Sequence, residues 1–215
     1  SLGFHVQADS FGNLADSTVV GTWADVSPSG LNGAAFNSPI IRTGSNGINS
    51  KPAIGFNGTN QYFNFGNTAI NFNGLTVFGV AQNQENYTSS WSNRAIVSKD
   101  NGGCAGSRFN LQRDSNSNGY YFEGPSLNVT NSAVALNENV ILSGYFSAAY
   151  NFSLIKNGGT PTTAGTDALA GTTGCPLQVG SRTTPGNYFQ GLISEVLLFN
   201  QPIVANSVYG VTWTD

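Results

Sequence analysis

The sequence is poor in charged residues, and its basic residues are scattered. Asp, Glu, Lys and Arg make up 9% of the 215 residues, against about a quarter in an average domain. No run of Lys and Arg exists that could neutralise a row of phosphates. The formal net charge of −3 also disfavours a polyanionic partner. The sequence therefore predicts no nucleic-acid partner.

Long apolar runs and methionine are missing as well. No segment approaches the roughly 18 apolar residues of a membrane span, so we expect no membrane insertion. The start of the chain has no signal-peptide pattern. The absence of Met indicates a processed protein or an excised domain rather than a complete translation product. Aromatic residues are 12% of the chain and the net charge is small, which favours a folded domain over disorder.

Cysteine and histidine are scarce. Cys104 and Cys175 are the only cysteines, and an even count in a chain poor in Lys favours one disulfide and an oxidising compartment. Two free buried thiols are the alternative. His5 is the only histidine, and it lies far from both cysteines in sequence, which argues against a zinc site. No G-x-S-x-G turn accompanies His5, so we expect it to be structural rather than part of a catalytic triad.

Asn-Gly pairs and short β-forming runs, by contrast, are abundant. Asn-Gly occurs seven times, and each pair suits a type I′ turn because both residues tolerate positive φ. Between the pairs lie runs rich in β-branched and aromatic residues, such as 75–82, 94–99 and 108–113. Helical periodicity is nearly absent, and no break in composition marks a second domain. This pattern predicts a single all-β domain over residues 1–215, an antiparallel sandwich or barrel.

Several segments together resemble the laminin G-like modules of the concanavalin A-like lectin/glucanase superfamily, especially the bacterial and phage versions. The opening "VVGTWADVSPSGLNGAAFNSP" resembles the W-x-D-x-S-G-x-x-N-x-A motif of that family, and the closing "LQVGSRTTPGNYFQGLISEVLLFN" resembles its final strand pair. These two segments are residues 19–39 and 177–200, and three further matches lie between them in the family order: residues 48–66, 75–82 and 151–159. The resemblance implies a two-sheet antiparallel jelly-roll β-sandwich with a concanavalin A-like fold.

One carboxylate, Glu195, stands in the most hydrophobic run, "NYFQGLISEVLLFN". In a regular strand it shares a face with Ile193 and Leu197, because side chains alternate with a period of two. Glycoside hydrolysis needs two carboxyl groups roughly 5 to 9 Å apart, and the E-x-D-x-x-E motif of the superfamily's glucanases does not occur. We therefore expect no enzymatic activity. Glu195 should be hydrogen-bonded, paired with a cation or turned outward at a bulge.

Calcium is the one cofactor for which the sequence offers a candidate site. Laminin G-like modules often bind Ca²⁺ at the rim of the sandwich through carboxylate and carbonyl oxygens, and Asp100 and Asn101 in "SKDNGG" offer such ligands. An Asp-Asn-Gly-Gly stretch is more often only a turn, because Asp and Asn hydrogen-bond to their own backbone.

Sugar binding needs an exposed aromatic ring for stacking and planar polar side chains that bond to hydroxyls. Candidate side chains gather in the central third of the chain and in one later loop: Tyr87, Trp91, Arg108, Gln112, Arg113, Tyr120, Tyr121, Arg182 and Tyr188. The alternative for Trp91 is that it covers a sheet edge.

These patterns favour a non-enzymatic recognition module outside the cell or on a cell or virion surface. It would be the glycan-binding or adhesive head of a larger bacterial or phage protein, such as a fibre tip. One alternative is a carbohydrate-binding module of a secreted polysaccharide-degrading enzyme. Another is a structural fibre or capsid domain that forms a homotrimer and has no small ligand.

Overall fold

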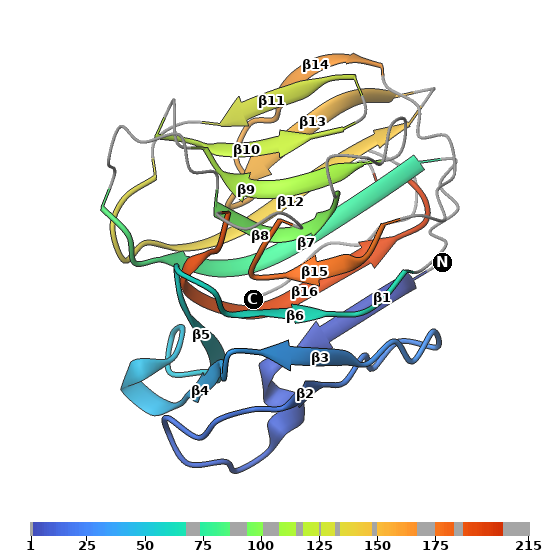
Figure 1. The fold of residues 1–215 in the computed structure, drawn as a ribbon. Helices are drawn as coiled ribbons and strands as arrows, with labels where there is room; N and C mark the ends of the chain where they lie inside the picture. The colour runs from blue at the N-terminus through green and yellow to red at the C-terminus, as the bar shows by residue number, and fades with distance from the viewer. Residues whose placement is uncertain are drawn as a thin grey trace.

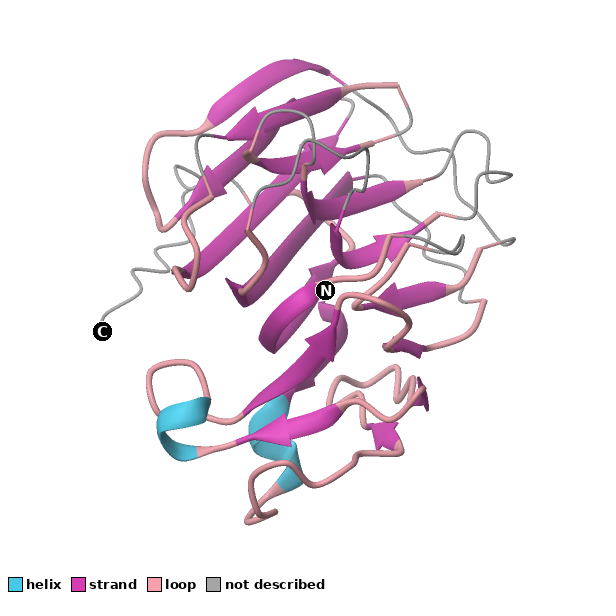
Figure 2. Ribbon diagram, turned by 60° about the vertical axis from the view of Figure 1, so that its left-hand side comes forward, coloured by secondary structure: helices cyan, strands magenta, loops and turns pink. Residues whose placement is uncertain are grey.

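The computed structural model describes residues 2–67, 74–86, 94–100, 108–114, 118–124, 126–131, 134–147, 150–166, 175–182 and 187–203. Strands dominate these residues. The helices among them are two short 3₁₀ turns, η1 (Ala8–Phe11) and η2 (Gly44–Asn46), which lie at the same end of the molecule (Figure 2). None of the described helices is long and apolar enough to cross a membrane. The predicted all-β class is confirmed.

Two antiparallel sheets form a sandwich, as Figure 1 shows. Sheet A has the order β14-β13-β12-β7-β16-β5-β4, and β1 pairs with β16. Its strands are β1 (Leu2–Gln7), β4 (Ile40–Arg42), β5 (Ala53–Asn57), β7 (Gly74–Asn83), β12 (Asn139–Ser147), β13 (Tyr150–Lys156), β14 (Thr162–Thr166) and β16 (Gln190–Phe199).

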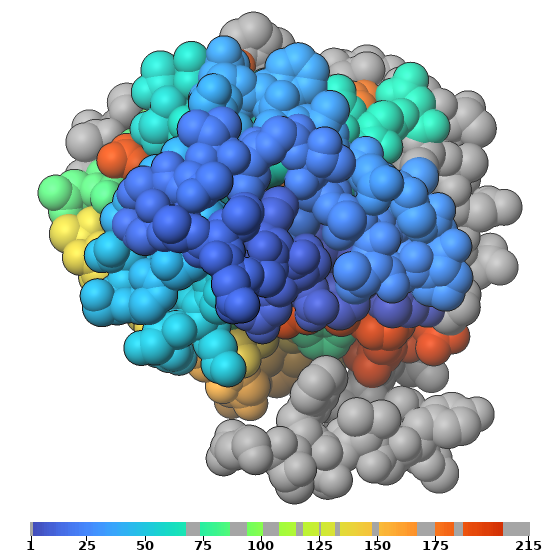
Figure 3. Space-filling model, turned by 90° about the horizontal axis from the view of Figure 1, so that it is seen from below, coloured from blue at the N-terminus to red at the C-terminus, as the bar shows by residue number. Residues whose placement is uncertain are grey.

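Sheet B has the order β11-β10-β9-β8-β15-β6-β3-β2. Its strands are β2 (Thr22–Trp23), β3 (Gly33–Phe36), β6 (Tyr62–Asn64), β8 (Arg94–Lys99), β9 (Phe109–Arg113), β10 (Tyr120–Glu123), β11 (Asn128–Asn131) and β15 (Leu177–Val179). Seen from below, the surface is formed largely by the N-terminal part of the chain, in blue and cyan (Figure 3).

The hydrophobic core lies between the sheets. In sheet B one inward row crosses the strands through residues that face one another in register: Phe122, Leu111, Val97, Val179 and Phe63. The ring of Phe122 stacks on that of Phe152 in sheet A, with centroids 4.7 Å apart. A Cβ on Gly144 would come within 2.6 Å of the Phe122 ring, so the absence of a side chain there permits the close approach of the sheets.

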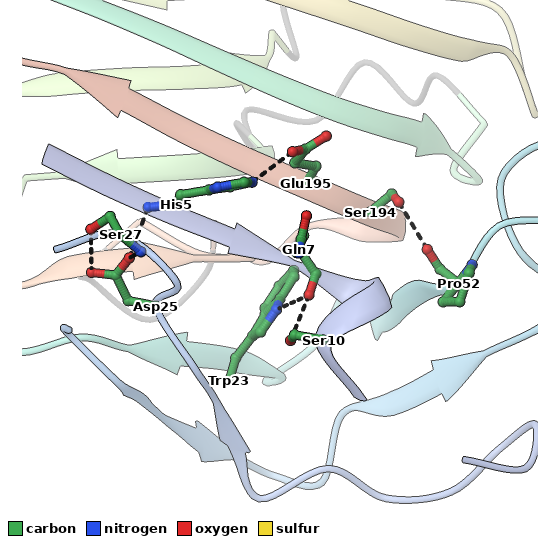
Figure 4. Close-up of polar contacts among 9 residues, drawn as sticks. All are labelled: His5, Gln7, Ser10, Trp23, Asp25, Ser27, Pro52, Ser194 and Glu195. Carbon is green, nitrogen blue, oxygen red and sulfur yellow. Dashed lines mark hydrogen bonds and ion pairs between the residues drawn. The ribbon is translucent and has the colours of Figure 1, made fainter. Parts of the chain in front are cut away.

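Glu195 lies at a β-bulge. The pairing of β16 with β7 shifts register between Ile193 and Glu195, so Ile193 and Val196 both reach the core while Glu195 turns outward. The expectation that Glu195 shares a face with Ile193 is therefore wrong. Its Oε1 lies 2.7 Å from Nε2 of His5 on the adjacent β1 (Figure 4). Glu195 and His5 thus stabilise the contact between two strands.

Asp25 gives the W-x-D segment its structural role. Its carboxylate accepts hydrogen bonds from the backbone N–H groups of His5 and Ser27 (Figure 4). It also accepts one from the backbone N–H of Leu31, and so ties the following loop to β1. Nearby, the indole N–H of Trp23 donates to the carbonyl of Gln7 at 3.1 Å. Burial raises the pKa of Asp25, but the hydrogen bonds from Ser29 and the three N–H groups outweigh it and hold the pKa below its usual value.

Candidate functional site

Several candidate side chains meet on the outer face of sheet B, which points away from sheet A. Strand alternation directs Leu111 of β9 into the core and its neighbours Asn110 and Gln112 to the opposite side. In β10, Glu123 faces Asn110 and Tyr121 faces Gln112. We call this surface the polar face: Asp100, Arg108, Asn110, Gln112, Tyr121, Glu123, Arg182 and Tyr188.

An ion-pair network occupies the centre of the polar face. Glu123 lies 2.8 Å from Arg108 and 3.4 Å from Arg182, and Arg182 also lies 2.5 Å from Asp100. Asn110 donates its amide hydrogens to Asp100 and Glu123 at 3.2 and 3.0 Å. Two guanidinium groups therefore balance two carboxylates, and the shared contacts hold the planar donors of both arginines in place. Arg108 is the most accessible member, with 37% of its side chain exposed.

Aromatic side chains flank this network. Tyr121 is half-buried, and burial together with the negative charges of Glu123 and Asp114 raises the pKa of its phenol to about 12. The hydroxyl of Tyr121 therefore stays protonated at neutral pH and remains a hydrogen-bond donor.

A second group of rings continues the polar face towards β3. Tyr188 forms isolated β-bridges with Ala95 and Ser181, and its ring centroid lies 6.0 Å from that of Tyr62. Tyr62 stacks on Phe36 at 4.5 Å with an interplanar angle of 6°, and Phe36 is 40% exposed. Sequence reasoning missed Tyr62 and Phe36, because only the pairing of β3 with β6 brings them together.

The floor of the polar face is made of buried amides. Asn110 and Gln112 are both fully buried. Within the part of the chain that the structure describes, neither amide atom of Gln112 has a hydrogen-bond partner, and Oδ1 of Asn110 has none. Unsatisfied buried amides are costly and rare in folded proteins. Because these atoms are buried, they belong to the interior beneath the polar face and are not themselves open to a ligand on its surface.

Arg113 and Tyr120 do not belong to the polar face. Both point between the sheets, where Tyr120 is fully buried with Nζ of Lys156 5.7 Å from its ring centroid. Burial and the charge of Glu138 raise the pKa of Tyr120. Arg113 pairs with Glu85 at 2.9 Å. The two residues contribute to the sandwich interior, because strand alternation separates them from Gln112 and Tyr121.

Four predicted residues lie outside the described residues: Tyr87, Trp91, Asn101 and Cys104. The Cys104–Cys175 disulfide and the calcium site therefore stay predictions. Cys175 itself is fully buried. Asp100 has Arg182 as an ion-pair partner, and the described residues contain no group of three or more His, Cys, Asp or Glu side chains suited to a metal ion.

The fold is that of a lectin-like β-sandwich, and solved structures share it. Domain 4 of AbnA, a GH43 extracellular arabinanase from Geobacillus stearothermophilus, in complex with arabinotriose, matches with a TM-score of 0.65 at 14% identity, over 92% of this chain and 91% of that one. The sialidase of Trypanosoma rangeli in complex with sialic acid matches with a TM-score of 0.60 at 12% identity, over 94% of this chain but 31% of the sialidase.

A third match is the CBM40 domain of the Ruminococcus gnavus IT-sialidase bound to α2,3-sialyllactose, with a TM-score of 0.52 and 15% identity over 63% of this chain and 80% of that one. No family model matches the sequence. No curated protein sequence matches it either. At these identities the likeness establishes the fold alone.

Proposed function

We propose that this chain is a non-enzymatic, extracellular glycan-binding module of laminin G-like type and that the polar face holds the glycan. The observation that carries the proposal is the meeting of two oriented guanidinium groups with half-exposed tyrosines on one sheet surface. Guanidinium N–H groups donate to sugar hydroxyls, and a tyrosine ring offers an apolar surface to the C–H groups of a pyranose.

The carboxylates of the polar face support a binding role over a hydrolytic one. Glu123 and Asp100 are both engaged by arginines, and Asp100 is almost fully buried. Asn110 donates its amide hydrogens to both carboxylates as well, so their oxygens are occupied by contacts within the polar face. Neither carboxylate stands free beside an open space where a glycosidic oxygen could approach it. We therefore assign these groups to positioning the arginines.

The setting within a larger protein has two candidates. We favour the head of a bacterial or phage surface protein or fibre. The alternative is a module of a secreted polysaccharide-degrading enzyme. It is supported by the similar domain of an extracellular arabinanase and by the sialidase, in which the region similar to this chain makes up 31% of a longer enzyme. A catalytic domain encoded in the same gene would favour the enzyme-linked module. A stable homotrimer without any glycan ligand would favour the structural alternative.

A glycan array that includes arabinotriose and α2,3-sialyllactose tests the proposal. We expect Arg108→Ala and Tyr188→Ala to weaken binding about tenfold each, the change produced by 1.4 kcal/mol. Arg108 suits the test because Glu123 keeps Arg182 as a partner when Arg108 is removed. Lys51→Ala removes one exposed positive charge away from the polar face and serves as the matched control. Circular dichroism checks that each variant is folded. Parental binding by both variants, or no glycan ligand for the parent, contradicts the proposal.

A further inference from the structure

A hollow lies on the outer face of sheet A, on the other side of the sandwich from the polar face. It is a groove of about 520 Å³ over the strands β4, β5, β16 and β7, beside η2. This volume is within the usual range of roughly 300 to 1,000 Å³ for small-ligand sites. All of its lining residues are among the described residues.

A glycine lies in the floor of the hollow. One outer row of sheet A runs from Ile40 through Gly55 and Leu192 to Gln82, with each residue facing the next across a strand pair. Gly55 has no side chain, and the side chains of Arg42 and Ile40 pack over it. A Cβ at Gly55 would come 3.2 Å from Cγ of Arg42 and 3.6 Å from Cγ1 of Ile40, so a larger residue would push these side chains into the groove. Ile40 is partly exposed and supplies a short apolar patch, whereas Leu192 is buried beneath the groove against Ile48 and Ala53.

Amide side chains form much of the remaining lining. Gln84 donates from Nε2 to Oε1 of Gln82 at 2.8 Å, and Gln82 donates in turn to Oδ1 of Asn139 at 2.7 Å. On another wall, Nε2 of Gln61 donates to the carbonyl of Ser38 at 2.8 Å. These bonds fix the orientation of the amides. Each amide carries two N–H donors and an acceptor oxygen with two lone pairs. The hydrogen bonds described above use only some of these, so N–H donors and oxygen lone pairs remain for a ligand.

The groove is close to electrically neutral. Arg42 is the one charged residue among the described residues that line it, and none of them is a carboxylate. Arg42 already pairs with Asp16 at 3.5 Å and donates to the hydroxyl of Ser17 at 2.9 Å. An anionic ligand would therefore meet a cation that is already compensated, whereas an uncharged polyol would meet oriented amides.

We propose that this amide groove binds a neutral saccharide, independently of the polar face. The amides of Gln61, Gln82 and Gln84 bond to sugar hydroxyls, and the partly exposed Ile40 contacts the C–H face of the ring. The groove selects against acidic sugars, because a sugar carboxylate would lie against the acceptor oxygens of the amides. The one cation nearby, Arg42, is already paired with Asp16. This inference goes beyond the proposed function, since it concerns a second site on the other sheet.

Titration of the ¹⁵N-labelled protein by NMR spectroscopy tests the proposal, with lactose and arabinotriose as neutral probes and α2,3-sialyllactose as the acidic one. We expect saturable shifts of the side-chain NH₂ signals of Gln82 and Gln84 with a neutral probe and weaker ones with the acidic probe. Gly55→Val fills the groove with a side chain that suits a strand and should weaken these shifts at least about tenfold. Gln84→Ala removes one amide at the exposed rim and should act in the same direction without filling the groove.

The backbone signals of Tyr121 and Tyr188 report the polar face in the same spectra, and Tyr188→Ala should leave the groove signals unchanged. Shifts at the polar face alone overturn the groove proposal and leave the proposed function standing. Shifts in the groove alone support the groove and contradict the assignment of the polar face. A groove that responds to neither neutral probe, or that prefers sialyllactose, overturns the proposal. The proposal is also overturned if the side-chain signals of the groove still shift with a neutral probe in both Gly55→Val and Gln84→Ala.

Discussion

Replacement of Lys99 by Met should make this protein more stable at neutral pH. Lys99 stands on the inward face of β8, where its partners in register are the core residues Phe109 and Leu177. It is fully buried, and its Nζ donates to the carbonyl oxygen of Cys175. No described carboxylate forms an ion pair with it. Burial lowers the pKa of Lys99 from 10.5 to about 8.

The size of the effect follows from this pKa. Below pH 8 the amine is charged in both states, and the lowered pKa costs the folded state about 3 kcal/mol at 1.4 kcal/mol per pH unit. The cost falls as the pH rises from about 8 to 10.5, because the folded state releases its proton before the unfolded state does. Met has a similar shape and no charge, but it loses the bond to Cys175, which is worth about 1 kcal/mol. We therefore expect a net gain of about 2 kcal/mol near neutral pH.

Denaturant unfolding of the parent and Lys99→Met over this pH range measures the difference in the free energy of unfolding. The advantage of Lys99→Met should shrink as the pH rises, vanish before the unfolded pKa of lysine is reached, and turn into a deficit of about 1 kcal/mol above it, because Met still lacks the bond to Cys175. Lys156→Met is the matched control, because Lys156 pairs with Glu138 at 2.7 Å and its replacement should destabilise the protein. A loss of stability in Lys99→Met at neutral pH, or a gain that does not change with pH, would refute the reasoning.

Two further predictions concern the segments that connect β1 to its neighbours. Asp25→Asn should cost about 2 to 3 kcal/mol, because the carboxylate accepts several hydrogen bonds in the folded state. The pKa of Asp25 is lowered, so the stability that its carboxylate contributes is present above the unfolded pKa of about 3.9 and is lost as the pH falls through the folded pKa. The stability of Asp25→Asn should therefore lack this loss at acid pH. If parent and variant lose stability in the same way on acidification, the assigned role of Asp25 is wrong. Glu195→Gln should cost about 1 kcal/mol by weakening the contact with His5. It should leave glycan binding at the polar face intact, because Glu195 and the polar face belong to different sheets; lost binding at the polar face in a folded variant contradicts this.

The side-chain pattern of the hairpin between residues 108 and 123 shows how far local sequence determines a site. Alternation alone predicts that Arg108, Asn110 and Gln112 share one face, and the structure places Asn110 and Gln112 there with Arg108 beside them. Alternation also separates Tyr120 from Tyr121. The choice of which tyrosine enters the core depends on the register with β9 and on the packing of Phe122 against sheet A, and both depend on distant strands.

Glu195 illustrates the opposite case. Its run predicts a strand, but a bulge of one residue reverses the face on which every later side chain lies. The bulge depends on the simultaneous pairing of β16 with β1, β5 and β7, which no local pattern encodes.

By itself, the sequence determined the all-β class, the positions of most strands and the scarcity of charge, because these depend on local alternation, turn residues and composition. Only the tertiary structure decided which side chains meet. Arg182 reaches Glu123 and Asp100 because β15 lies beside β8, although the two strands are far apart in the chain. The amide groove likewise exists because β4, β5, β16 and β7 lie side by side. Such contacts depend on strand order, which long-range packing selects.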